Sequence, residues 1–379
     1  MTRRRGGARL ELAGLLIAAA LAAGLLAWGA RSGRAGEPGG HTLWPSGGGA
    51  LVVWRDQSGD LVARFTSPAG HATERSLGAG SDVRLIAGGP RPVLLVTDPG
   101  GGHRLLRFSA ASAAWTTIAA ALPPDDLTTA ALSRGLLYVP VGAGRRAAVL
   151  ATDAGGRVVA RLALPILEPD PTALVPGPGA AIEPARPGRG RVRALLVAGG
   201  DVLAVTATGQ AAAVTDLRTH ETASLAGYTR LAAATVGGDG FVYLLAGRSD
   251  PAFTLRFLRV AVHPLRVLWA WDTDAAPDGA AATALPTRFG AAFYAAAAFG
   301  SPASPDAGLW LIDSTGARRD EAVSTSLGPR MGPGRGDSVL LYGAAGGAVT
   351  RVDTDDGARS RADARLRAPS GATVLLAAD

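Results

Sequence analysis

The sequence predicts an all-β protein, a seven-bladed β-propeller preceded by one amino-terminal transmembrane helix. Beyond residue 48, short apolar runs bounded by Gly, Pro and Asp recur, and no stretch has the 3.6-residue apolar period of a helix. These runs form a four-strand unit that returns every 44 to 57 residues, the spacing of propeller blades. Before the repeats lies one long apolar segment, residues 10–30.

The amino terminus predicts a membrane anchor. Residues 1–9 form a basic tail, and residues 10–30 are apolar except for Glu11. A helix of about 20 apolar residues crosses the hydrocarbon core of a bilayer. Four arginines precede the segment and two follow it, which favours a cytoplasmic tail and an extracytoplasmic carboxy-terminal part. We therefore expect a signal anchor in the plasma membrane, with secretion after cleavage near 27–29 or 33–35 as the alternative.

Composition sets further limits on the rest of the chain. Residues 31–47 are rich in Gly and Pro and predict a flexible linker, so the propeller is expected over 48–379. The net charge is +7, but residues 1–34 carry +5 of it and no basic run follows. Nucleic-acid binding is not expected, because phosphate contacts need clustered cations. The absence of Cys excludes disulfides, thiolate metal sites and a lipoprotein anchor.

The repeat is clearest in residues 126–165. They divide at their turns into four strands, which we call A to D, at 128–132, 136–141, 147–152 and 157–164. The predicted A strands start near residues 82, 127, 172, 229, 281, 325 and 371. The copy over 172–218 is irregular, and the Pro/Gly-rich residues 165–191 are predicted to form a surface loop within this fourth blade.

The two ends of the repeat region predict how the ring closes. Residues 49–56 have the character of a B strand, and C and D strands follow at 60–65 and 71–77. Residues 372–379 have the character of an A strand with no blade after it. A carboxy-terminal A strand that completes the first blade would remove exposed sheet edges. The count is seven blades, with six or eight as alternatives because of the irregular fourth copy.

The turns between strands C and D share a pattern, in which an aliphatic strand is followed by Asp and, within four residues, by Gly. It occurs at 149–156, 309–316 and 349–357. The Asp side chains are predicted to cap the turns and the glycines to supply positive φ. These residues are Asp153, Asp313 and Asp353, with Gly156, Gly316 and Gly357.

This arrangement resembles quinoprotein-like and related bacterial β-propellers over most of residues 48–379. Quinone-dependent enzymes of this resemblance carry regularly placed tryptophans, a metal site and often an adjacent cysteine pair. Here Trp115, Trp269 and Trp271 fall irregularly and Cys is absent. The sequence therefore predicts no quinone and no other cofactor.

Residues with the chemistry for a site are few. The five His residues have none of the short spacings typical of zinc sites, and no nucleophile motif or phosphate loop is present. No catalytic or metal-binding residue is predicted. Asp125-Asp126 and His220-Glu221 fall in predicted connections from a D strand to the next A strand, which border the mouth of a propeller. These four are the candidate binding residues, with ordinary solvated loop charge as the alternative.

The stretch GPGRGDS, residues 332–338, contains the Arg-Gly-Asp tripeptide that many extracellular ligands present to adhesion receptors. The repeat puts Arg335-Gly336 in a turn between strands A and B, as it does for 133–135 and 288–290. We therefore interpret the tripeptide as a turn between two strands of the seventh blade.

Together these features favour a membrane-anchored, extracytoplasmic binding or scaffold module for a protein or another ligand of the cell envelope, and not an enzyme. This prediction rests on analogy between propellers, because a fold does not imply a function. The alternative is a hydrolase or lyase that uses the central mouth, with or without a bound metal ion. Carboxylate or His side chains converging at the axis would favour the enzyme, and a mouth lined by Ala, Leu and Gly would favour the binding module.

Overall fold

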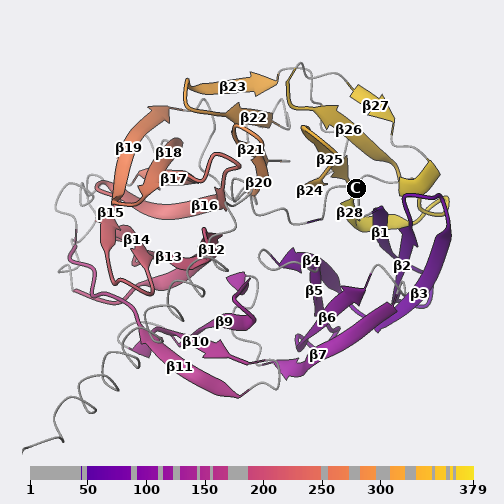
Figure 1. Cartoon of the computed structure of the whole chain (residues 1–379), viewed down its shortest axis with the longest axis horizontal. Helices are drawn as coiled ribbons and strands as arrows, with labels where there is room; N and C mark the ends of the chain where they lie inside the picture. The colour runs from indigo at the N-terminus through magenta and orange to yellow at the C-terminus, as the bar shows by residue number, and fades with distance from the viewer. Residues whose placement is uncertain are drawn as a thin grey trace, which may run out of the picture. The chain divides into compact units, whose positions relative to one another are not determined.

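The computed structural model describes residues 44, 49–86, 92–109, 114–122, 129–142, 146–153, 157–169, 187–248, 255–272, 282–295, 308–320, 330–343, 346–355, 359–361 and 364–379. They belong to the unit Gly40–Asp379, which by itself forms a ring of seven four-stranded sheets (Figure 1). The predicted seven-bladed propeller is confirmed, against the alternatives of six or eight blades. The predicted tail 1–9 and transmembrane helix 10–30 lie outside the described residues. Among the described residues, no helix has the length and hydropathy to cross a membrane.

The blades are numbered in chain order, and each contains its strands in the order A to D. Blade 1 consists of β28 (Thr373–Ala378), β1 (Ala50–Arg55), β2 (Asp60–Thr66) and β3 (Ala72–Ala79). Blade 2 consists of β4 (Asp82–Ile86), β5 (Val93–Thr97), β6 (His103–Ser109) and β7 (Ala114–Leu122). Blade 3 consists of β8 (Ala131–Ser133), β9 (Leu136–Val141), β10 (Ala148–Thr152) and β11 (Val158–Ala163).

The remaining four blades follow the same order. Blade 4 consists of β12 (Arg191–Ala198), β13 (Asp201–Ala207), β14 (Ala212–Asp216) and β15 (Thr222–Ser224). Blade 5 consists of β16 (Tyr228–Val236), β17 (Val242–Arg248), β18 (Leu255–Val262) and β19 (Leu265–Asp272). Blade 6 consists of β20 (Ala282–Thr287), β21 (Gly290–Ala295), β22 (Gly308–Ile312) and β23 (Ala317–Asp320). Blade 7 consists of β24 (Arg330–Pro333), β25 (Ser338–Tyr342), β26 (Val349–Asp353) and β27 (Arg359–Arg361), and a 3-10 turn, η5 (Ala364–Leu366), precedes β28.

Strand β28 closes the ring as the sequence predicts. It pairs antiparallel with β1, so that Val53 lies opposite Leu376 and Leu51 opposite Ala378. Blade 1 thus combines the first three strands of the propeller with its last one. This pairing gives β1 hydrogen-bonded neighbours on both sides and leaves no open sheet edge at the seam.

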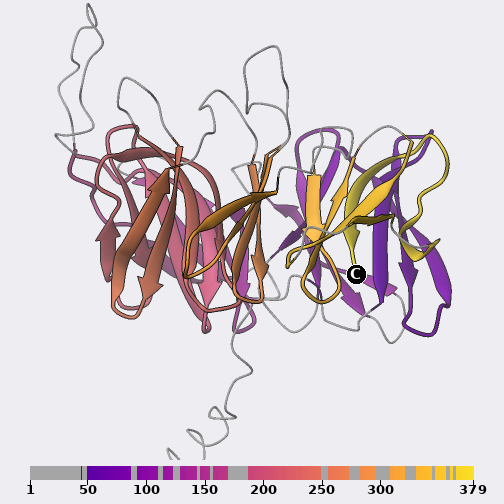
Figure 2. The same ribbon diagram turned by 90° about the horizontal axis from the view of Figure 1, so that it is seen from above.

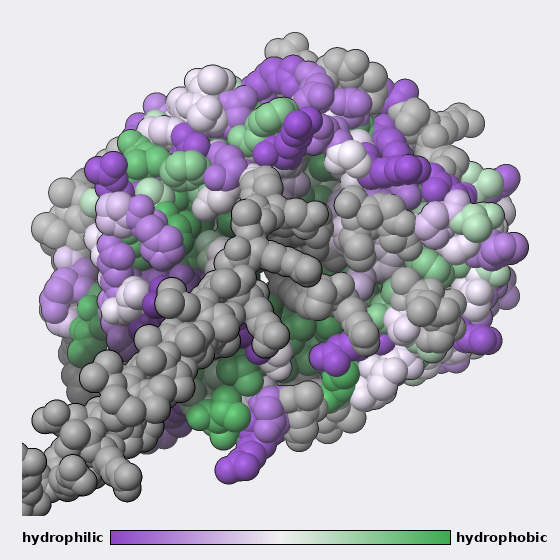
Figure 3. Space-filling view, in the orientation of Figure 1, coloured by the Kyte–Doolittle hydropathy of each residue, from purple (hydrophilic) through white to green (hydrophobic). Residues whose placement is uncertain are grey.

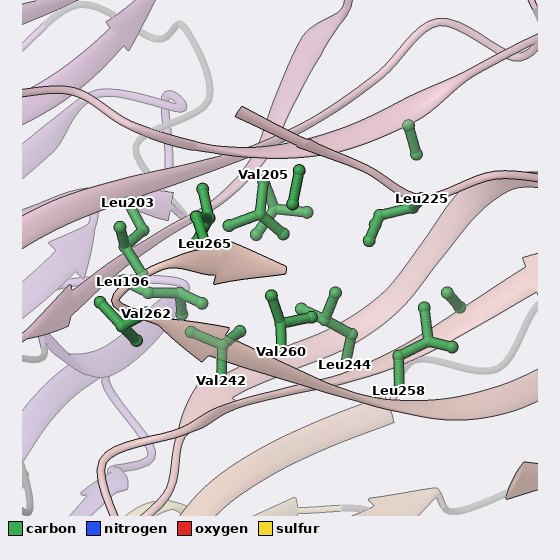
Figure 4. Packing of buried hydrophobic residues seen from close by; sticks show 14 of the residues in the cluster. Leu196, Leu203, Val205, Leu225, Val242, Leu244, Leu258, Val260, Val262 and Leu265 are labelled. Atoms are coloured by element: carbon green, nitrogen blue, oxygen red, sulfur yellow. The ribbon is translucent and has the colours of Figure 1, made fainter. Parts of the chain in front are cut away.

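The core lies between the blades. Every residue of β13 is buried, whereas the outermost strand β11 is mostly exposed, because inner strands are covered on both faces by neighbouring blades. Figure 4 shows one such layer, where Leu203 and Val205 of blade 4 face Leu244 and Leu258 of blade 5. Burying a side chain of this size contributes about 1.5–3 kcal/mol, so the interblade layers stabilise the ring.

The two ends of the ring carry different connections between strands. Its strands stand across the thickness of the ring, as Figure 2 shows, and neighbouring strands in each blade are antiparallel. The A–B and C–D turns therefore lie at one end, which we call the A–B face. The B–C and D–A connections lie at the other end, which we call the D–A face.

The aspartates of the C–D turns cap these turns as predicted. Asp313 Oδ1 accepts two backbone N–H groups of its own turn, at 2.6 and 3.2 Å. Asp153 and Asp353 each accept one backbone N–H group, at 2.9 and 2.8 Å. Gly316 has the predicted positive φ, +154°, while Gly156 and Gly357 lie outside the described residues.

The Arg-Gly-Asp tripeptide lies in the turn between β24 and β25, which confirms the interpretation from the repeat. Gly336 has a φ of +66°, which favours glycine at this turn position. The Ser338 hydroxyl donates to the backbone oxygen of Arg335 at 2.7 Å and ties the turn together.

The predicted boundaries of blade 4 are wrong. The sequence interpretation starts its A strand near residue 172, whereas the A strand is β12 and begins at Arg191. The apolar segment Arg191–Ala198, which follows the predicted A strand along the chain, is itself strand A, and β13 is strand B. The two are joined by a hairpin of only two residues, Gly199 and Gly200, whose φ values are +57° and +91°. The insertion predicted within blade 4 connects blades 3 and 4 instead, and Leu167 and Gly188 form a bridge near its ends.

One residue of the predicted linker 31–47 belongs to the propeller core. Trp44 is buried, and its ring stacks on Phe108 of blade 2 with 5.8 Å between the ring centroids. Its indole N–H donates to the backbone oxygen of Gly49 at 2.6 Å, so the polar edge of the ring is satisfied. The chain therefore contributes to the core before residue 48, where the propeller was predicted to start.

Candidate functional site

The A strands of the blades surround a central channel. It has a cavity of about 750 Å³, lined by residues of β4, β12, β16, β20, β24 and β28, by Tyr342 of β25 and by residues just before β8. Most of the lining residues are Ala, Leu and Val, and among the described residues no Asp, Glu or His lines the cavity. In Figure 3, hydrophobic residues are visible just below the centre of the face and also toward its left edge, and hydrophilic residues are common on its rim.

Three arginines interrupt the apolar lining: Arg84 of β4, Arg193 of β12 and Arg330 of β24. Arg330 Nη1 donates to Asp82 Oδ1 at 2.7 Å and to the backbone oxygen of Leu375 at 2.9 Å. Arg84 Nε donates to the other oxygen of Asp82 at 3.0 Å. Arg193 is exposed, and within the described part of the chain it makes no hydrogen bond or ion pair.

The carboxylate of Asp82 is ionised at neutral pH. Burial raises its pKa, but the hydrogen bond and charge of Arg330, together with those of Arg84, outweigh burial and lower the pKa below its ordinary value of 3.8. Two guanidinium groups, those of Arg84 and Arg330, thus share one carboxylate, and Arg193 is unpaired in the described part of the chain, so the three arginines exceed Asp82 by two positive charges. An apolar cavity with this charge suits an anionic ligand better than a cation.

The candidate residues from the sequence do not form this site. Asp125 and Asp126 lie outside the described residues. His220 and Glu221 lie in the turn between β14 and β15, which is a C–D turn on the A–B face. Their predicted position in a D-to-A connection is wrong, because that position depended on the misplaced boundaries of blade 4. Their role in ligand binding stays a prediction.

The contact that Glu221 makes joins two blades. Its Oε1 accepts the backbone N–H of Leu265, at 2.8 Å, at the start of the outermost strand of blade 5. The backbone N–H of His220 donates to the oxygen of Asp216 at 2.9 Å, and His220 has a φ of +62°. Both residues therefore take part in the turn and its packing.

The sequence contains a signal for two of the channel arginines in the repeat itself. Arg84 and Arg193 are each the third residue of their A strand, in β4 and β12, whereas Arg330 is the first residue of β24. A comparison of equivalent positions across the repeats reveals the position shared by Arg84 and Arg193, provided that β12 is recognised as an A strand.

A second cavity, of about 490 Å³, lies on the A–B face between the turns of blades 6 and 7. Arg288, Phe289 and Asp337 are among its lining residues. Arg288 Nη1 lies 3.9 Å from Asp337 Oδ2, so the aspartate of the Arg-Gly-Asp turn faces a cation of its own chain. This cavity carries charges of both signs and favours no single class of ligand.

A cluster of charges on the A–B face joins blades 3, 4 and 5. Asp201 is buried and accepts two hydrogen bonds from Arg218, at 2.7 and 3.0 Å. Arg134 and His263 lie 3.6 and 3.5 Å from its carboxylate oxygens. Among the described residues no group of three or more His, Asp or Glu side chains could hold a metal ion. This cluster surrounds one carboxylate with two arginines and one His, which is not a set of metal ligands.

The fold and the channel define a seven-bladed β-propeller with an apolar, arginine-bearing centre. No protein-family model and no curated protein matches the chain. Solved structures match its fold. A putative 6-phosphogluconolactonase from Bacteroides uniformis has a TM-score of 0.55 at 11% identity, and the match covers 86% of this chain and 98% of that one.

Two further solved structures are similar to a lesser degree. The periplasmic gluconolactonase of Pseudomonas aeruginosa has a TM-score of 0.49 at 16% identity, over 86% of this chain and 99% of that one. TolB from Acinetobacter baumannii has a TM-score of 0.43 at 11% identity, over 86% of this chain and 81% of that one. The resemblance to bacterial β-propellers is thus confirmed as a resemblance of fold alone.

Proposed function

We propose that this protein is a binding module of the cell envelope that holds its ligand in the central channel. The observation that carries this proposal is the lining of the channel, where Ala, Leu and Val predominate and the polar lining residues in the described part of the chain include no carboxylate or imidazole. A hydrolase or lyase needs a positioned general acid or base, which such side chains most often supply. The channel lining therefore supports binding over catalysis.

The location we propose is extracytoplasmic and anchored to the plasma membrane. It is supported by the apolar segment 10–30, by the arginines that precede it and by the Gly/Pro-rich segment that follows. Protease treatment of spheroplasts tests it, because an extracytoplasmic propeller is cleaved from outside while a cytoplasmic one is protected. Recovery of the protein in the medium would point instead to cleavage of the segment.

Blocking the channel tests the binding function. Thr283 of β20 lines the cavity and is half-buried, so Thr283→Trp places a bulky ring in the channel. Thr116→Trp is the matched control, because Thr116 is exposed on the outermost strand of blade 2. The two full-length variants and the wild type are used to capture partners from a detergent-solubilised envelope fraction.

We expect the wild type and Thr116→Trp to retain the same partner and Thr283→Trp to lose it. Melting temperatures of the three proteins show that the propeller is intact in each. Equal capture by both variants would contradict a binding site in the channel.

A further inference from the structure

We infer that the channel binds an organic oxyanion, a carboxylate or a phosphate ester attached to an apolar body, and that Arg193, Arg84 and Arg330 contact its charged end. This inference rests on the proposed function, because it names the ligand class of the same channel. Three features of the channel carry it: the excess positive charge, the unused arginine donors and the apolar walls.

The excess charge identifies the sign of the ligand. Asp82 contacts both Arg84 and Arg330 from behind the lining, and among the described residues no acid lines the cavity and no other acid pairs with these arginines. Arg193 has no partner in the described part of the chain, although it lies in the wall of the cavity. Asp82 neutralises only part of the positive charge of the three arginines, so a negatively charged ligand can neutralise more of it.

The unused donors identify the shape of the charged group. A guanidinium has five N–H donors, and Arg84 contacts Asp82 through Nε alone while Arg330 uses Nη1 alone. Because Asp82 holds both side chains by its two oxygens, their remaining donors are restrained before any ligand binds. Paired N–H donors of arginine match the oxygens of carboxylates and phosphates, which accept them two at a time.

The apolar walls identify the rest of the ligand. Ala194, Leu231 and Leu285 line the same cavity as the arginines. A volume of about 750 Å³ lies within the range of small-molecule sites. Inorganic phosphate would leave these walls uncovered, whereas an organic acid or phosphate ester fills the cavity and uses the arginines for its charged end.

Three small probes test the inference with the full-length protein in detergent. Phenylacetate and phenyl phosphate carry an apolar ring and one of the two oxyanions, and phenylacetamide has a similar shape without charge. Saturation-transfer NMR detects their binding, and titration gives their dissociation constants. The variant is Arg193→Glu, because Arg193 has no partner in the described residues whose loss would disturb the fold. Arg75→Glu on the exposed outer strand β3 is the control for net charge.

We expect at least one of the two anions to bind more tightly than phenylacetamide, and the tighter anion identifies the oxyanion that the channel prefers. Arg193→Glu weakens that anion by about tenfold or more, as expected when a charge-assisted contact is replaced by repulsion. Arg75→Glu leaves the binding unchanged. Phenylacetamide binding as tightly as both anions, or an unchanged affinity in Arg193→Glu, would overturn the inference.

The envelope capture experiment separates this inference from the function on which it rests. If Thr283→Trp abolishes capture while the probes show no preference for charge, the channel is a binding site and the ligand class is wrong. If Thr283→Trp leaves capture intact, the proposed function itself fails.

Discussion

Arg330 of blade 7 and Asp82 of blade 2 form an ion pair at 2.7 Å that spans the seam of the ring. The same Arg330 nitrogen donates to Leu375 of β28, the strand of blade 1 that lies between them in the ring. Three blades are therefore linked by one guanidinium at the point where the last strand closes the propeller. The ion pair of Arg330 with Asp82, which lies at the channel wall, therefore also stabilises the closure of the ring.

Asp82→Asn is expected to lower the free energy of unfolding at neutral pH by about 1.5–3 kcal/mol, the range for hydrogen bonds to charged groups. The pKa of Asp82 is lowered in the folded protein, so its contribution is complete above the ordinary value of 3.8. That contribution is lost as the pH falls through the lower folded pKa. Urea unfolding of both proteins between pH 7 and pH 2 measures the difference. A difference that stayed constant down to pH 2 would contradict this account.

Closure of the ring by β28 is tested by Leu376→Ala. Leu376 is 4% exposed and lies opposite Val53 across the seam, so its truncation leaves a cavity in the layer between blades 1 and 2. We expect a loss of about 2–5 kcal/mol, as for other buried Leu to Ala substitutions. Thr373→Ala, at an exposed position of the same strand, is expected to cost much less. Equal effects of the two substitutions on thermal unfolding would show that the Leu376 side chain does not stabilise the closure of the ring.

Two positions of the GPGRGDS stretch, 332 and 336, require glycine for different reasons. A Cβ atom on Gly332 would lie 2.1 Å from the backbone oxygen of Ala377, so β24 and β28 can approach only because that atom is missing. Gly336 has open space around its Cα, and only its φ of +66° disfavours a side chain. We expect Gly336→Ala to cost about 1 kcal/mol, and Gly332→Ala to cost clearly more because backbone must shift. Thermal unfolding of the two variants compares them directly, and the reverse order would contradict the packing argument.

Much of the fold can be predicted from this sequence because its determinants are local. The capping role of Asp313 and the turn at Gly336 both follow from a few adjacent residues, and similar turns recur in other repeats. The closure by β28 can also be predicted from the sequence. Residues 372–379 form an A strand without a blade of its own, and the first blade has B, C and D strands but no A strand. Blade 4 could not be placed in the same way, since two apolar segments competed for the A position and only the Gly199-Gly200 hairpin decides between them.

The channel could not be predicted because its residues meet only in three dimensions. Arg84, Arg193 and Arg330 are separated by more than a hundred residues in the chain, and each looks like an ordinary strand residue on its own. From the sequence alone, acidic and His residues in connections are the expected binding residues, because functional groups are commonly found on loops. The structure instead points to a position within the A strands, and the sequence reveals it only when equivalent positions of the blades are compared.

The charge cluster around Asp201 is expected to stabilise the A–B face. The two hydrogen bonds from Arg218 lower the pKa of Asp201, with burial opposing them and the nearby cations adding to them. Because the folded pKa is lowered, the stabilisation is present above the ordinary value of 3.8 and is lost as the pH falls through the folded value. We expect Asp201→Asn to lower stability at neutral pH by about 1–3 kcal/mol.

Arg134→Ala provides the comparison within the same cluster. Arg134 is 65% exposed and lies 3.6 Å from Asp201, so water screens its interaction with the carboxylate. Its removal is expected to cost under about 1 kcal/mol, as for other exposed ion pairs. A double-mutant cycle with Asp201→Asn and Arg218→Ala then gives the coupling between the paired groups, measured by urea unfolding at pH 7. Coupling near zero would mean that the Asp201–Arg218 ion pair does not stabilise the contact between blades 3, 4 and 5.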